Sequence, residues 1–222
     1  KSMTTGSGQL IRRTDGTLAI LTNHHVIGEK AKTVWVHFDG APFAQKVNVL
    51  GRDKLIDLAL LEVPSPLPDG VRPIAIASTP VKIGDLVFAF GYPSGNRSAT
   101  FGIITSTSSP NDLYGIEVYE TNQAPVYPGN SGGPLLRRSK KTGEVELVGV
   151  NTAIATQRGE KMQLASNLTF SISARIITKA LPKLEKEERG VHAFLGMVIA
   201  DTRLVPPIAY EELTGSSYPP SR

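Results

Sequence analysis

The feature that most constrains this 222-residue chain is a succession of short apolar segments separated by residues that favour turns. Two sets of such segments follow one another along the chain. They cover residues 9–11, 18–21, 34–38, 44–50 and 58–63, and then 86–90, 100–105, 116–121, 133–136, 145–150 and 168–172. Short strands at fairly regular spacing are typical of barrels and sandwiches. The pattern therefore predicts an all-β protein built from two sets of strands.

The two strand sets meet around residues 77–84, after a proline-rich loop at 64–70 that can sustain neither a helix nor a sheet ladder. From Ser171 onward the apolar spacing becomes helical, and Ser171 or Ser173 could cap the start. The residues on the apolar face are Ile172, Ile176, Ile177, Ala180, Leu181 and Leu184. We predict a C-terminal helix that stops or bends near Pro182.

A serine set among glycines stands in the segment Gly-Asn-Ser-Gly-Gly-Pro-Leu at 129–135. Ser131 in this setting is a candidate nucleophile, because nearby backbone amides could face a developing oxyanion. The same residue types are also the commonest turn formers. The segment alone therefore leaves both interpretations open.

A serine nucleophile needs a base, and the base needs an orienting acid. A histidine pair at 24–25 follows one predicted strand, and Asp57 directly precedes another. Taken singly, such residues are usually solvated or turn-forming. Together with Ser131 they form the chain order His, Asp, Ser, each beside a strand edge, with the serine in the second set. This order predicts a site in the cleft between two barrels.

Segments 22–26, 57–61 and 129–135 resemble the active-site segments of chymotrypsin-fold serine proteases, and specifically those of the HtrA/Deg branch. Further similarities lie at 6–8, 91–93, 149–153 and 170–177, so the resemblance covers roughly residues 4 to 184. It implies two six-stranded antiparallel β-barrels with a C-terminal helix.

The resemblance also implies how the chain is divided. Residues 1–78 would form the N-terminal barrel, and residues 79–184 the C-terminal barrel with its helix. Residues 185–222 would be a C-terminal extension or the truncated start of a following domain. Within them, 193–198 resemble the opening of a peptide-binding PDZ domain, and we expect no complete PDZ domain.

Three catalytic roles follow from the resemblance, residue by residue. His25 rather than His24 is the general base, because the family motif ends in His-Val. Asp57 rather than Asp53 is the orienting acid, and Ser131 is the nucleophile.

The resemblance places an oxyanion hole at the N–H groups of Gly129 and Ser131, with Asn130 shaping the turn between them. Digestive members of the fold carry an aspartate before the serine, which pairs with a new N-terminus after zymogen cleavage. Asn130 is neutral, so we predict no activation by N-terminal cleavage. One departure concerns the support of this loop, because Asn122-Gln123-Ala124 stands where many relatives have Thr-Asp-Ala.

The family alignment also implies a primary substrate pocket. Its base would be formed by Ala124, Pro125 and Val126, and its wall by Asn151, Thr152 and Ala153. Since none of these residues is acidic, we predict that small or medium apolar side chains bind there, with no preference for Lys or Arg.

The implied activity is that of a serine endopeptidase acting on unfolded or extended polypeptides through an acyl-enzyme, as in protein quality control. The alternative is a catalytically silent module that binds peptides or partners, because HtrA-like sites can rest with a misformed oxyanion loop. The resemblance implies no cofactor and no metal, leaves a homotrimer open, and favours a periplasmic or secreted location.

Composition excludes several other classes. The chain contains no cysteine, which rules out disulfides, thiolate nucleophiles and cysteine zinc sites. No apolar run approaches the ~18 residues of a membrane span. The net charge is +4, and part of the excess lies at 137–141, where a solvated loop tip is expected rather than a nucleic-acid patch. No aromatic residues interleave with these charges, so no nucleic-acid partner is predicted.

Overall fold

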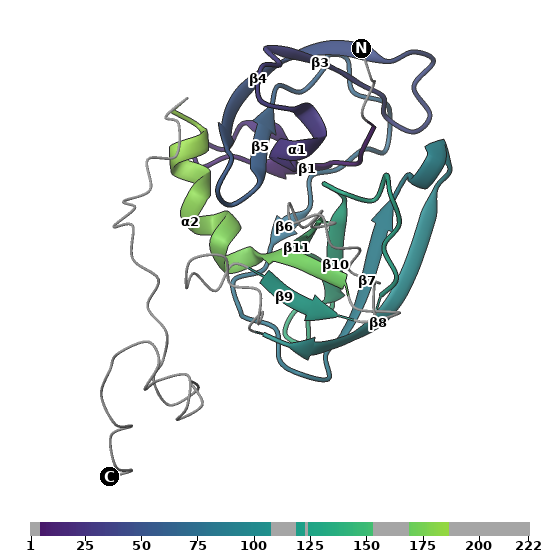
Figure 1. The fold of residues 1–222 in the computed structure, drawn as a ribbon, viewed down its shortest axis with the longest axis vertical. Helices are drawn as coiled ribbons and strands as arrows, with labels where there is room; N and C mark the ends of the chain where they lie inside the picture. Colours follow the sequence, from purple (N-terminus) through teal and green to yellow (C-terminus); the bar gives the residue numbers. More distant parts are fainter. Residues whose placement is uncertain (1–4, 108–118, 123, 153–168, 187–222) are drawn as a thin grey trace, which may run out of the picture. The chain divides into compact units, whose positions relative to one another are not determined.

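The computed structural model describes residues 5–107, 119–122, 124–152 and 169–186. Strands dominate these residues and form one five-stranded and one seven-stranded sheet, with few helical residues between them (Figure 1). The prediction of an all-β protein is therefore confirmed.

The first sheet is antiparallel throughout, in the strand order β1-β2-β5-β4-β3. Its strands are β1 (Gln9–Arg12), β2 (Leu18–Thr22), β3 (Thr33–Val36), β4 (Gln45–Asp53) and β5 (Leu58–Leu61). A short helix, α1 (His24–Ile27), leads from β2 toward β3. Apolar side chains of this sheet close over one core, which includes Leu10, Ile20, Val47 and Leu61.

The second sheet holds the remaining strands. They are β6 (Ala75–Ile76), β7 (Leu86–Gly91), β8 (Ser98–Ser106), β9 (Tyr119–Asn122), β10 (Pro134–Arg138), β11 (Val145–Thr152) and β12 (Thr169–Ser173). A 3₁₀ turn, Pro93–Gly95, separates β7 from β8. Pairing runs β7-β8-β9-β12-β11-β10, and β10 also pairs with β7, which closes a ring of six strands.

The strand count departs from the implied pair of six-stranded antiparallel barrels. The first sheet has five strands among the described residues, and β6 joins the second sheet as an added strand parallel to β11. The pattern of the sequence could not reveal β6, because two residues carry no periodicity. The domain boundaries at residues 78 and 184 stay predictions.

The predicted C-terminal helix is α2 (Ala174–Leu184), and Ser173 caps it by accepting a hydrogen bond from the Ile176 N–H at 3.4 Å. Pro182 lies inside the helix and does not stop it. A proline removes one backbone donor, and here the loss falls in the last turn, where the helix ends two residues later. The buried face consists of Ala174, Ile177, Ala180, Leu181 and Leu184.

Helix α2 contacts both sheets: β11 and β12 of the second, and β4 and β5 of the first. Its last turn lies directly on β4 at Gly51. A Cβ atom at Gly51 would lie 1.9 Å from the Leu184 carbonyl oxygen, so only glycine permits this approach. The helix therefore holds the two sheets together.

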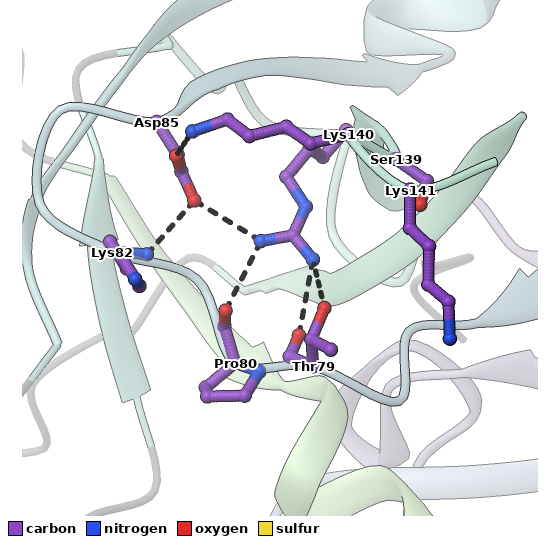
Figure 2. A pocket seen from close by; sticks show the side chains of 8 residues that line it. Thr79, Pro80, Lys82, Asp85, Ser139, Lys140 and Lys141 are labelled. Carbon is purple, nitrogen blue, oxygen red and sulfur yellow. Dashed lines mark hydrogen bonds and ion pairs between the residues drawn. The ribbon is translucent and has the colours of Figure 1, made fainter. Parts of the chain in front are cut away.

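The loop between β6 and β7 is anchored by Arg137 of β10, which is 7% exposed. Its guanidinium donates to Asp85 Oδ2 at 3.1 Å and to the carbonyls of Thr79 and Pro80 (Figure 2). It also donates to Glu146 Oε1 at 2.6 Å. The expectation that residues 137–141 form a solvated loop tip is therefore wrong for Arg137. Glu146 lies opposite Arg137 on the adjacent strand β11, but Asp85 is 52 positions away, where a local reading of charge could not find it.

Asp85 carries a prediction about stability. Burial alone would raise the pKa of Asp85, but hydrogen bonds from Lys140 Nζ, the Lys82 N–H and Arg137 lower it below its usual 3.8. Stability from the ionised form is therefore present above pH 3.8 and is lost as pH falls through the lowered pKa. Asp85→Asn should lower the free energy of unfolding at pH 7 by about 3 kcal/mol, and the difference should shrink in strong acid.

Urea unfolding at pH 7 and near pH 2 measures this difference. Asp39→Asn is the matched control, because Asp39 forms an exposed ion pair with Arg97 at 2.8 Å. The control should change the free energy of unfolding by less than about 0.5 kcal/mol. Equal effects of the two substitutions would contradict the assignment of Arg137–Asp85 as an anchor.

Candidate active site

The pairing of β2 with β5 brings two of the predicted site residues together. Thr22 of β2 lies opposite Ala59 of β5 in the antiparallel register. His25 follows Thr22 by three residues, and Asp57 precedes Ala59 by two. Both side chains therefore emerge at the same edge of the first sheet.

His25 and Asp57 are joined by two hydrogen bonds. Nδ1 of His25 lies 2.7 Å from Oδ2 of Asp57, and the His25 backbone N–H donates to Oδ1 at 2.9 Å. A carboxylate only accepts hydrogen bonds, so Nδ1 carries the proton, and in the neutral ring Nε2 is the nitrogen that can accept one. The His25 side chain is 44% exposed and that of Asp57 17% exposed, which leaves the ring accessible from the solvent.

The backbone of Asp57 adopts an unusual conformation. Its φ of 55° makes it the one non-glycine residue with positive φ among those described. Two donors hold its carbonyl oxygen, the His24 N–H at 3.1 Å and Asn23 Nδ2 at 2.9 Å. Such strain costs on the order of 1–3 kcal/mol and persists only where surrounding contacts impose it. Here those contacts direct the carboxylate toward His25.

Thr152 reaches Asp57 from the second sheet. Its hydroxyl donates to Asp57 Oδ2 at 3.0 Å, and the residue is almost completely buried. From the sequence, Thr152 was predicted in the wall of the substrate pocket, and its bond to Asp57 was not predicted. No local signal could have revealed it, because the two residues are 95 positions apart.

The neighbouring residues of the same types have other contacts. The ring of His24 turns toward Glu29, with Nε2 3.6 Å from Oε2. Asp53 closes a local turn by accepting backbone N–H groups two and three residues later. Of the two histidines and two aspartates, His25 and Asp57 are therefore the ones whose side chains pair with each other at the edge of the first sheet.

The serine segment at 129–135 forms a tightly bonded turn before β10. Ser131 is 5% exposed and Asn130 is fully buried. The Asn130 carbonyl accepts from the Gly133 N–H at 2.9 Å, and the Gly132 N–H donates to the Asn151 carbonyl at 2.9 Å. The turn is therefore fixed both internally and to β11.

Gly132 brings the serine turn against the strand that leads to His25. Its φ is 85°, and a Cβ there would lie 2.2 Å from Thr22 Oγ1 and 3.1 Å from the Asn23 N. A side chain at this position would thus force the two segments apart. The structure brings the segments of Ser131, His25 and Asp57 into one region.

The residues of the predicted substrate pocket are distributed differently. Ala124 is fully buried in the apolar core of the second sheet, whereas Pro125 and Val126 are half-buried. Asn151 is also fully buried, and its Nδ2 donates to the Pro134 carbonyl at 3.0 Å. Ala153 lies outside the described residues, as does Gln123. The pocket role of this set stays a prediction.

In the described part of the chain, no three histidine, aspartate or glutamate side chains form a group that could bind a metal ion. None of its helices is long and apolar enough to cross a membrane.

The geometry of fold and site agrees with comparisons to known proteins. The family model described as "Trypsin-like peptidase domain" matches residues 6–150, which contain all three candidate residues. The chain belongs to this family of trypsin-like peptidase domains.

Its relatives are proteases of the HtrA/Deg type. The periplasmic pH-dependent serine endoprotease DegQ of Escherichia coli is 33% identical over 194 residues, covering 86% of this chain and 40% of DegQ. The serine protease Do-like HtrA of Bacillus subtilis is 30% identical over 213 residues, covering 90% of this chain and 44% of that protein. The chain thus spans about two-fifths of the length of the curated relatives it matches.

A solved structure shows the same fold. The crystal structure of the serine endoprotease from Yersinia pestis matches with a TM-score of 0.67 and 28% identity. The match covers 89% of this chain and 65% of that one.

His24 predicts a pH effect on stability. Burial lowers the pKa of His24 below its usual 6.5, although Glu29 and Asp57 act in the opposite direction; Arg52 and Lys54 lower it further. Below pH 6.5 the unfolded chain therefore binds more protons at this position, and the contribution of His24 to stability falls with acidification. His24→Asn should reduce the loss of stability between pH 7 and pH 5.

Urea unfolding of both proteins at pH 8, 7 and 5 tests this expectation, with pH 8 as the internal reference because the imidazole is neutral in both states there. A variant that loses as much stability as the wild type between pH 7 and pH 5 would contradict it.

Proposed function

We propose that this chain is a serine endopeptidase domain that hydrolyses peptide bonds through an acyl-enzyme. Ser131 attacks the substrate carbonyl while Nε2 of His25 takes the hydroxyl proton. Asp57 holds the imidazole in the Nδ1–H tautomer and stabilises the imidazolium that forms. His25 then protonates the leaving amine, and water attacks the acyl-enzyme in the second half of the reaction.

The observation that carries the proposal is the pairing of His25 Nδ1 with Asp57 Oδ2 at 2.7 Å. This pairing orients the basic nitrogen of the ring away from Asp57. It is supported by the packing of Gly132, the residue after Ser131, against the end of β2. A histidine held in this way beside a serine turn is what an activated serine requires.

The N–H groups of Gly129 and Ser131 are proposed to bind the oxyanion, with Asn130 between them. Gly129 has a φ of 105°, a conformation that favours glycine. Loss of one oxyanion donor typically reduces kcat by roughly 100- to 1,000-fold. The backbone of this turn is therefore as important for the reaction as its serine.

The proposed substrates are unfolded or extended polypeptides with small or medium apolar side chains before the cleaved bond. This preference rests on the absence of a carboxylate from the pocket set Ala124, Pro125, Val126, Asn151, Thr152 and Ala153. The names of DegQ and of other relatives include the word periplasmic, which supports an extracytoplasmic location for this protein. A homotrimer stays a prediction of the resemblance.

A fluorophosphonate probe tests the activity, because it labels only an activated serine. We expect labelling of the wild type, loss of labelling in Ser131→Ala, and wild-type labelling in the control Ser78→Ala, which removes an exposed hydroxyl of the loop between β6 and β7. Absence of labelling under all conditions would contradict the proposal and favour the silent binding module.

Digestion of unfolded casein followed by mass spectrometry tests the specificity. Cleavage after small and medium apolar residues is expected. Dominant cleavage after Lys or Arg would refute the pocket assignment while leaving the activity intact.

A further inference from the structure

Ser7 lies just before β1 and makes hydrogen bonds with four other residues of the site region. Its hydroxyl donates to the Gly129 carbonyl at 2.7 Å and accepts from the Tyr92 N–H at 2.9 Å. Its backbone N–H donates to the Ser131 carbonyl at 2.8 Å. Its own carbonyl accepts from Thr22 Oγ1 at 2.7 Å. Ser7 is thus bonded to both ends of the turn that carries the nucleophile.

These hydrogen bonds fix the orientation of the peptide groups in the turn. With the Gly129 carbonyl held by Ser7, the N–H of the same peptide group, on Asn130, donates on the opposite side to the Tyr127 carbonyl at 2.9 Å. The next carbonyl, that of Asn130, accepts from Gly133. The Asn130 carbonyl and the Ser131 N–H belong to one trans peptide group, in which C=O and N–H point in opposite directions. Because the carbonyl points toward Gly133, the Ser131 N–H points away from it.

The position accepts little besides serine. Ser7 is buried, at 9% exposure. A Cβ at Gly133 would lie 3.1 Å from the Ser7 Cβ, so the two segments are in close contact here. A residue at position 7 must therefore be small and must both donate and accept a hydrogen bond. Alanine satisfies the first requirement and fails the second.

We propose that Ser7 is a positioning residue for the oxyanion hole, an inference that rests on the function proposed above. Its hydroxyl holds the Gly129 carbonyl on the inner side of the turn, which keeps Gly129 and Ser131 in the conformation that binds the oxyanion. Because the oxyanion exists only in the tetrahedral states, Ser7 acts on the transition state and hardly on substrate binding.

Ser7→Ala tests the proposal, since it removes both side-chain bonds and leaves the backbone bonds in place. With a peptide substrate, kcat should fall by roughly 10- to 100-fold, less than the loss of an oxyanion donor itself, while KM stays within about twofold. The affinity for a peptide boronate, whose tetrahedral adduct occupies the oxyanion hole, should fall by the same factor as kcat.

Ser173→Ala is the matched control, because Ser173 is another buried serine, whose hydroxyl caps α2. It should lower the melting temperature and leave kcat and boronate affinity unchanged. If Ser7→Ala does not fold, Ser7→Cys replaces it, because a thiol is only a weak hydrogen-bond donor. A lower kcat of Ser7→Cys at unchanged KM supports the proposal, and an unchanged kcat overturns it.

Two failures are distinguishable. A wild type that neither hydrolyses peptides nor reacts with the fluorophosphonate refutes the proposed function. The role of Ser7 alone is refuted if the wild-type activity depends on Ser131 but Ser7→Ala keeps the wild-type kcat. It is also refuted if Ser7→Ala loses activity only through a higher KM.

Discussion

The arrangement of the site depends on the carboxylate of Asp57. Three donors converge on it: the backbone N–H of His25, Nδ1 of His25 and the hydroxyl of Thr152. A largely buried carboxylate is costly unless such bonds compensate for lost hydration. The first two donors follow from the pairing of β2 with β5, whereas the third belongs to the second sheet. This one side chain therefore needs both sheets in place.

The rest of the structure keeps those sheets in place. Helix α2 contacts both of them, and its end rests on Gly51 of the first. Within the second sheet, Arg137 ties the loop between β6 and β7 to β10 through its buried bond to Asp85, and it also bonds to Glu146 of β11. Around the serine, Ser7 and Gly132 connect the turn to the beginning of the chain and to β2. Rigid elements thus surround a site whose geometry must be held closely.

Much of this could be predicted from local patterns. The short apolar segment at 86–90 predicted β7, and the structure shows that its side chains alternate between exposed and buried. The short segments and turn residues predicted the other long strands. Residue types in chain order indicated the histidine pair at 24–25, Asp57 and Ser131, and the family resemblance selected His25. What could not be predicted are contacts between distant positions. Examples are the bonds from Thr152 to Asp57 and from Ser7 to Gly129, and the burial of Arg137 in a segment that reads as solvated.

Asp57 holds the neutral ring of His25 in the Nδ1–H tautomer, and the proposed chemistry depends on this tautomer. Nitrogen NMR of histidine-labelled protein at pH 8 measures it directly, with His25→Gln assigning the signals. We expect a protonated Nδ1 and an unprotonated Nε2 at His25, and loss of this pattern in Asp57→Asn. A His25 ring with its proton on Nε2 in the wild type would contradict it.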